Sequence, residues 1–210
     1  MKILLHPSYF PSIATFAAIA QHEVVWEVHD NFQKQTYRNR CYISTDKGKH
    51  MLNIPIKHVG SKEGRQKYAD VGTENSYNWK KEHWRTLETA YRTSPFFEFY
   101  EDELLPLYEG NEKSLYDFNQ KTIGAIADCI GLEIPTEKTN KYQAKPESHF
   151  DARFLVDAKK ERNWNIPPYS QVFEERHGFI PNLSVLDLLF NEGTNTLSYL
   201  KSLSLDLKNA

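Results

Sequence analysis

The sequence predicts an α/β or α+β fold: a small mixed sheet, formed by an N-terminal βαβ unit and a β-hairpin, packed by helices from the middle and C-terminal thirds. Short apolar runs with the patterning of strands fall within about the first 72 residues. From Trp79 onward the apolar residues recur with helical spacing. Hydrophobic residues make up 40% of the 210 positions, which is enough for a core.

The first predicted element is the βαβ unit. Residues 3–5 (Ile-Leu-Leu) form a short apolar run, Ser12 can cap the helix that follows, and residues 24–28 alternate like a second strand. Such units normally have parallel strands and a right-handed crossover. Ligands collect beyond the carboxyl ends of their strands. We therefore expect a crevice between residues 6–9 and residues 29–34.

A β-hairpin is expected next. Residues 37–44 and 50–57 read as strands, and the turn between them contains Gly48, which can adopt a positive φ. Residues 59–67 are polar and contain glycine, so they predict a surface loop able to act as a lid. Residues 68–71 predict another short strand.

Helices follow the sheet-forming part. Their apolar stripes and end signals predict helices over residues 79–92, from Ser94-Pro95 to about residue 107, over residues 114–130 with Gly131 as the stop, and over residues 185–191 between Ser184 and Gly193. Asp187 falls in the first turn of a buried helix, so its carboxylate needs a partner. His177 to Ser184 is interpreted as mainly structural.

We predict a single domain over residues 1–210. Its parts are a sheet-rich region at about 1–72, a helical region at about 76–132, a linker at about 136–148 and a C-terminal extension at about 149–210.

Composition limits the partners. With 26 basic and 28 acidic residues, the chain has no global field for nucleic acid, so nucleic acid is not expected as a partner. No signal peptide or membrane-length apolar run is apparent, which predicts a cytoplasmic protein without membrane insertion. Cys41 and Cys129 are expected as reduced thiols. The eight scattered histidines indicate no metal site, and we expect no cofactor. A homo-oligomer stays open.

The segment from Asn31 to Cys41 predicts an anion site. It concentrates cations, amides and aromatic rings, and on a strand Arg38 and Arg40 would share one face while Cys41 points to the other. The expected roles are to hold the anion (Lys34, Arg38 and Arg40) and to orient it (Tyr37 and Asn39). The structural alternative is surface charge, or pairing with carboxylates such as Glu27.

Two residues are candidate proton acceptors. Glu27 lies near the end of the second strand, and His83 lies on the apolar stripe of the first long helix, where a hydrogen-bonded core histidine is the alternative. Tyr9 and His6 lie at the end of the first strand, and Tyr9 is a candidate for binding substrate. Their position is similar to that of phosphate-contacting histidines in nucleotidyltransferases, but the His-x-Gly-His motif of those enzymes is missing.

A series of motifs in order along the chain resembles the WbqC-like protein family, in its shorter branch typical of Bacteroidetes. The motifs are Tyr9-Phe-Pro11, Lys34 to Cys41, Leu52-Asn-Ile-Pro-Ile56, Trp79 with His83-Trp84, Ala90 to Phe97, Tyr169 to Phe173 and His177 to Gly193. Longer members carry His-Gln-Pro where this chain has Leu5-His6-Pro7, so a role of that first histidine does not carry over. A second strand-like Tyr-Leu-Ser-Gly segment of the longer members is also missing.

The resemblance implies a setting in O-antigen (lipopolysaccharide) biosynthesis or related sugar-nucleotide metabolism. The expected function is an enzyme that binds an anionic, phosphorylated small molecule such as a sugar nucleotide for a group-transfer step. One alternative is a non-catalytic ligand-binding or scaffold protein that keeps the fold, so catalysis itself stays open. A second alternative is a nucleotidyltransferase-like enzyme.

Overall fold

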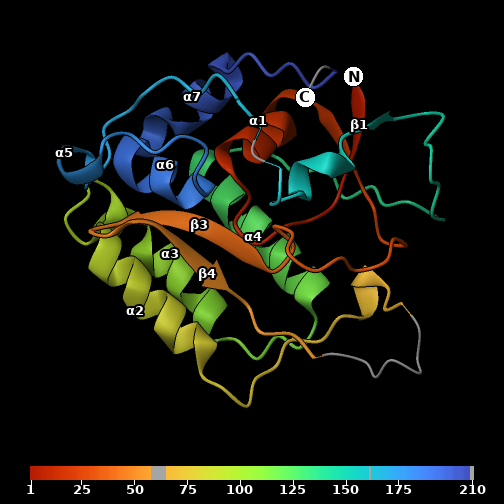
Figure 1. Cartoon of the computed structure of the whole chain (residues 1–210), viewed down its shortest axis with the longest axis horizontal. Helices are drawn as coiled ribbons and strands as arrows, with labels where there is room; N and C mark the ends of the chain where they lie inside the picture. Colours follow the sequence, from red (N-terminus) through yellow and green to blue (C-terminus); the bar gives the residue numbers. More distant parts are fainter. Residues whose placement is uncertain (58–64, 161, 209–210) are drawn as a thin grey trace.

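A computed structural model of the chain describes residues 1–57, 65–160 and 162–208 and confirms the mixed α/β fold (Figure 1). The strands are β1 (Lys2–Leu5), β2 (Glu23–Trp26), β3 (Arg40–Thr45), β4 (Gly48–Asn53) and β5 (Phe150–Asp151). They form two sheets: a parallel one in the order β2-β1-β5, and the antiparallel pair β3-β4. The predicted lid loop at 59–67 lies largely outside the described residues, which omit 58–64.

The βαβ prediction is confirmed. Helix α1 (Ile13–Gln21) follows Ser12, whose Oγ accepts a hydrogen bond from the backbone N–H of Thr15 and so caps the first turn. Strand β2 then returns parallel to β1, with Leu5 opposite Trp26. Strand β5 pairs with the other edge of β1, so β1 is the central strand. Because β5 has only two residues, it shows no alternation of apolar and polar side chains that would indicate a strand, and the sequence did not predict it.

The hairpin is confirmed with shorter strands than expected. Gly48 has a φ of 93° and closes the turn, and Tyr42 is opposite Met51. Strand β4 ends at Asn53, two residues before Pro55, which has no N–H for a sheet ladder. Strand β3 begins only at Arg40, so Arg38 precedes the strand and the expected alternation does not apply to it.

The predicted helices are present. They are α2 (Trp79–Tyr91), α3 (Phe97–Glu109), α4 (Leu115–Ile130) and α6 (Val185–Glu192). The structure adds α7 (Thr196–Ser202) and a short α5 (Glu174–His177), which the sequence did not predict. Ser114 caps α4, and Gly131 ends it with a φ of 68°. Helix α3 begins three residues after the predicted start at Ser94, whose Oγ donates to the carbonyl of Tyr91 instead.

The prediction of a strand at residues 68–71 is wrong. Tyr68 to Asp70 forms a 3₁₀-helix, η2, and a second one, η3, spans Arg153 to Val156. The Tyr68 side chain is fully buried and its hydroxyl donates to the carbonyl of Pro7. Anchoring of this ring, rather than pairing of the backbone, determines the local conformation.

Asp187 has the partners that its burial requires. Its carboxylate accepts hydrogen bonds from the hydroxyls of Tyr91 (2.7 Å) and Tyr169 (2.5 Å) and from the amide of Gln171 (2.8 Å). Burial nevertheless raises its pKa above the ordinary value. Helix α6 is thereby tied to α2 and to the segment before α5. Among the described residues, no helix is both long and apolar enough to cross a membrane.

Candidate functional site

Charged side chains gather where the three parallel strands end. His6 directly follows β1, Glu27 directly follows β2, and Asp151 is the last residue of β5. The strands are in register, with Leu5 opposite Trp26 and Leu4 opposite Asp151, so these ends meet at one edge of the sheet. Ligands of parallel sheets usually bind just beyond the carboxyl ends of the strands. This edge of the sheet is therefore the expected position of a ligand.

His6, Asp30 and Arg38 form one half of the cluster. His6 Nε2 lies 3.0 Å from Asp30 Oδ2, and Arg38 Nη2 lies 3.2 Å from the same oxygen. Arg38 also donates to the carbonyl of Asn31 and stacks on Tyr68, with its guanidinium carbon 5.2 Å from the ring centre. His6 and Arg38 are almost fully buried, so their shared carboxylate is needed to compensate the arginine.

Glu27, Asp151 and Arg153 form the other half. Arg153 binds both carboxylate oxygens of Asp151, through Nε at 2.8 Å and Nη2 at 2.7 Å. Its Nη1 lies 3.4 Å from Oε2 of Glu27, which is fully buried. Glu27 Oε1 accepts from the backbone N–H of His29 and the hydroxyl of Thr139. Arg153 thus joins the ends of β2 and β5.

A cavity of about 400 Å³ opens over the two halves, and we call it the strand-end cavity. Its lining contains four cationic and two carboxylate side chains together with His6. The charged residues of the lining are Lys34, Arg38, Arg153, Lys159, Asp30 and Asp157. The excess of cations favours a ligand with more than one negative charge.

Protonation in the cluster follows from burial and from the neighbouring charges. Burial, and then the charge of Arg38, lower the pKa of His6 to about 4, so its ring is neutral near pH 7. Burial alone would raise the pKa of Asp30, but the hydrogen bond from His6 and the charge of Arg38 hold it below its ordinary value. Because an ionised carboxylate can only accept, the single ring proton of His6 lies on Nε2, and Nδ1 carries the lone pair.

Two polar atoms of the cluster lack partners among the described residues. Nδ1 of His6 and Nε of Arg38 are both buried without a hydrogen bond. Buried polar atoms are nearly always satisfied, so this unpaired acceptor and this unpaired donor call for an explanation. A bound ligand with both an acceptor and a donor group would satisfy the pair.

Comparison with known proteins decides the family. The family model described as "WbqC-like protein family" matches residues 6–163. The chain belongs to this family. It is also 27% identical over 202 residues to "Uncharacterized protein Rv1507c" of Mycobacterium tuberculosis, covering 83% of this chain and 86% of that protein. No solved structure matches the chain.

The WbqC-like match includes every member of the strand-end cluster, from His6 to Arg153, whereas α6 and α7 lie beyond it. The cluster is therefore built within the family's shared region, whereas α6 and α7 lie outside that region and pack on α1. Helix α7 packs on α1, which leads from β1 to β2 (Figure 1).

The predicted anion-binding residues divide between cavities. Lys34 and Arg38 line the strand-end cavity. Asn39 and Arg40, again with Lys34, line a neighbouring cavity of about 350 Å³ beside the hairpin. The amide of Asn39 donates to Asn53 Oδ1 and to the carbonyl of Ile54, and thereby joins the chain ahead of β3 to the end of β4. Tyr37 lines a third and larger space.

That third space, the aromatic cavity, measures about 820 Å³ and is lined by Tyr37, Tyr42 and Trp164 among others. The thiol of the segment, Cys41, is buried and belongs to the lining of none of these three cavities, and burial raises its pKa.

Tyr9 and His83 lie together in the core, apart from the residues that line the strand-end cavity. The hydroxyl of Tyr9 is 2.9 Å from His83 Nδ1 and 2.8 Å from the hydroxyl of Tyr108. Burial lowers the pKa of His83 to about 4. Glu27 is not part of the lining of the strand-end cavity; it lines another cavity of about 200 Å³. The assignment of Glu27 or His83 as proton acceptor stays a prediction.

Sequence analysis did not select Asp30, Arg153 or Lys159. Asp30 lies in the predicted crevice and could have been chosen as the carboxylate nearest His6. Arg153 and Lys159 follow β5, and their approach to β1 depends on a two-residue strand that has no sequence signal of its own.

Proposed function

We propose that this WbqC-like protein is an enzyme of bacterial surface-polysaccharide or sugar-nucleotide metabolism. It binds an anionic, phosphorylated substrate in the strand-end cavity and catalyses a group transfer. The family name points to polysaccharide metabolism. The cationic lining of the cavity, which includes Lys34 and Arg38, supports an anionic ligand.

The observation that carries the catalytic part is the His6–Asp30 pair. Nε2 of His6 donates to Oδ2 of Asp30 over 3.0 Å, while Nδ1 is buried and unpaired among the described residues. A neutral imidazole, oriented by a carboxylate through one nitrogen and carrying a lone pair on the other, is the arrangement of a general base. We therefore assign the proton-acceptor role to His6 in place of Glu27 or His83.

A bound anion would raise the pKa of His6 and so make its imidazole a stronger base. The charge of Arg38 is one of the two main causes that depress the pKa of His6. A phosphate bound to Arg38 would offset that charge and raise the pKa of the imidazole toward its ordinary value. The histidine would then be a base chiefly when the substrate is in place.

In the proposed step, an acceptor oxygen or nitrogen forms a bond to the electrophilic atom of the phosphorylated donor. The donor's bond to its phosphate leaving group breaks, and the electron pair goes to the leaving oxygen. The acceptor's proton passes to Nδ1 of His6, while the Nε2 hydrogen stays on its bond to Asp30. Arg38 and Lys34 stabilise the added charge of the leaving phosphate.

Ligand-induced thermal stabilisation tests the binding part. The probes are inorganic pyrophosphate, hexose 1-phosphates and a panel of nucleotide sugars. At a concentration one hundred times Kd, a ligand stabilises the folded state by about 2.7 kcal/mol. We expect this stabilisation in the wild type and its loss in Arg38→Gln and in Lys34→Gln, a surface variant that leaves the core untouched.

The matched control is Arg92→Gln. Arg92 is a partly exposed arginine that pairs with Glu88 and Glu101 on α2 and α3. Its loss should leave ligand binding unchanged. Binding that is equal in Lys34→Gln, Arg38→Gln and the control would overturn the assignment, as would the lack of any stabilisation in the wild type.

His6→Gln separates catalysis from binding alone. Glutamine can still donate to Asp30 and is the residue that the longer resembling proteins carry, but it cannot accept a proton. With the nucleotide sugar that stabilises most, incubated with amino-sugar and hydroxyl acceptors, we expect product from the wild type and a loss of 10²-fold or more in His6→Gln. Binding by both proteins without turnover by either would favour the non-catalytic alternative.

A further inference from the structure

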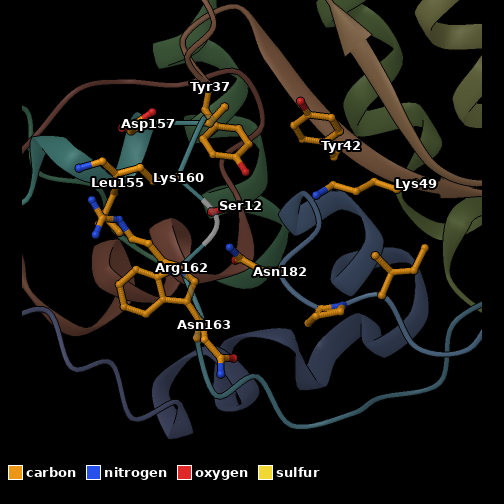
Figure 2. A pocket seen from close by; sticks show the side chains of 14 residues that line it. Ser12, Tyr37, Tyr42, Lys49, Leu155, Asp157, Lys160, Arg162, Asn163 and Asn182 are labelled. Atoms are coloured by element: carbon orange, nitrogen blue, oxygen red, sulfur yellow. The ribbon is translucent and has the colours of Figure 1, made fainter. Parts of the chain in front are cut away.

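The aromatic cavity, shown in Figure 2, has Asp157 in common with the strand-end cavity but has a different chemical character. Its walls come from the chain ahead of β3, the hairpin, the segment after η3 and the turn before α6. At about 820 Å³ it is within the size range of cavities that hold nucleotide-sized ligands.

Aromatic rings form one part of the wall. The rings of Tyr37 and Tyr42 stand edge to face, with centroids 5.9 Å apart and planes at 84°. Both rings are half-buried, as is Trp164, the third aromatic residue of the lining. Two rings at a right angle offer a corner that a flat ring can occupy, stacked on one and touching the edge of the other.

Cations surround these rings. Lys49, Lys160 and Arg162 line the cavity, and Asp157 is the single carboxylate of the described lining. Figure 2 shows Lys49 on the side of Tyr42, with Lys160 and Arg162 across the cavity from it. Lys49 Nζ lies over the Tyr42 ring, 4.6 Å from its centre, so this cation covers one face of the ring.

A fixed amide completes the polar groups. Asn182 lies in the turn before α6 with a φ of 53°, and its Oδ1 accepts a hydrogen bond from the backbone N–H of Ala14 at 2.9 Å. This bond sets the amide plane and leaves the Nδ2 hydrogens as donors. Figure 2 shows the side chain projecting into the cavity. An oriented amide among aromatic rings suits the carbonyl and ring nitrogens of a nucleobase.

The two cavities share a wall. Asp157 lines both of them and forms an isolated β-bridge with Thr36, the residue before Tyr37. Phe154 of the strand-end cavity and Arg162 of the aromatic cavity stack on each other, with the guanidinium carbon 4.5 Å from the ring centre. A ligand that passes over this wall would reach the His6–Asp30 pair from the aromatic cavity.

We infer that the aromatic cavity binds the nucleoside phosphate half of a sugar nucleotide, while the sugar half extends into the strand-end cavity. The base stacks in the corner of Tyr37 and Tyr42, and Lys160 and Arg162 bind the phosphates. This inference rests on the proposed function, because it divides one substrate between the two cavities. Aromatic rings alone would equally suit a sugar, and it is the excess of cations that points to a nucleotide.

Titration with purine and pyrimidine nucleoside 5′-monophosphates tests this division. Loss of one stacking ring in Tyr42→Ala should weaken nucleotide binding about tenfold or more. Lys160→Glu, at an exposed position that leaves the fold intact, should weaken it similarly through charge. Tyr77→Ala and Lys47→Glu remove exposed side chains that belong to the lining of neither cavity, and they should leave binding unchanged.

Tryptophan fluorescence places the nucleotide directly. A base in the aromatic cavity should quench Trp164, one of four tryptophans, and Trp164→Phe should remove this quenching while nucleotide binding persists by calorimetry. Quenching that survives in Trp164→Phe, or binding that is insensitive to both Tyr42→Ala and Lys160→Glu, would overturn the inference.

The same variants distinguish this inference from the proposed function. Hexose 1-phosphate and pyrophosphate should bind Tyr42→Ala like the wild type and should lose affinity in Arg38→Gln. If they behave in this way while no nucleoside monophosphate binds, the strand-end site stands and the assignment of the aromatic cavity falls. If nucleotide binding is lost in Tyr42→Ala but no ligand binds more weakly to Arg38→Gln, the assignment of the aromatic cavity stands and the strand-end site falls.

Discussion

Replacement of His6 by glutamine is expected to change the pH dependence of stability in a defined direction. The side chain is almost fully buried, and its pKa is lowered from 6.5 to about 4 by burial and by Arg38. In the unfolded chain the same imidazole would take up a proton near its ordinary pKa. Between these two values the unfolded chain binds more protons than the folded one, so folding becomes less favourable as the pH falls.

The magnitude follows from the two pKa values. A pKa difference of one unit corresponds to about 1.4 kcal/mol, so moving from about pH 7 to about pH 4.5 removes roughly 2 kcal/mol of stability through His6. Because the pKa of His6 is lower in the folded than in the unfolded chain, its contribution to the free energy of unfolding is present above pH 6.5. This contribution is lost as the pH falls from 6.5 to about 4. In His6→Gln this loss does not occur, because glutamine does not titrate.

Guanidinium unfolding followed by tryptophan fluorescence at several pH values measures the effect. The difference in unfolding free energy between wild type and His6→Gln should move by roughly 2 kcal/mol in favour of the variant as the pH falls across this range. His83→Gln should give a similar trend, because the pKa of His83 is also lowered to about 4.

The control is His149→Gln, since His149 bonds to its neighbour Ser148 at the surface. Its curve should run parallel to that of the wild type. A free-energy difference between wild type and His6→Gln that stays constant with pH would refute the neutral, buried state of His6, and with it the proton-acceptor assignment.

Two further predictions concern the fold. Gly193→Ala should destabilise the chain by about 3 kcal/mol, because a β-carbon there would lie 2.5 Å from the Phe96 ring and φ is 54°. Gly124→Ala, in α4 with open space around it, should instead stabilise the chain by about 0.5–1 kcal/mol. Thermal unfolding of the two variants measures both effects. Asp187→Ala should cost about 3 kcal/mol or more in urea unfolding, because it removes the acceptor of two buried hydroxyls, those of Tyr91 and Tyr169; stability equal to the wild type would contradict the network.

Local signals were enough to predict most of the secondary structure. Ser12 and Ser114 cap helices because their hydroxyls accept from the first turn, and Gly48 and Gly131 close a turn and a helix because they adopt positive φ. These effects act over four or five residues and can be read from the chain. Where a distant contact decides, as with the buried Tyr68 ring, the sequence-based strand was wrong.

The candidate site was predictable in part. Its position followed from a general rule, that ligands bind beyond the carboxyl ends of parallel strands, and Lys34 and Arg38 were selected from local composition alone. The assembled charges were not predictable, because Arg38 meets Asp30 through a loop and Arg153 arrives by way of β5. The divergence of Arg38 and Arg40 into separate cavities also depends on where β3 begins.

By itself, the sequence determined the βαβ unit, the hairpin, the longer helices and the concentration of cations and amides near residue 38, since each depends on neighbours in the chain. Only the tertiary structure decided that His6 pairs with Asp30, that Arg153 closes the cluster from a segment more than one hundred residues away, and that Tyr37 lines the aromatic cavity. Ion pairs across strand ends depend on sheet order and register, and a single sequence does not encode these in any local pattern.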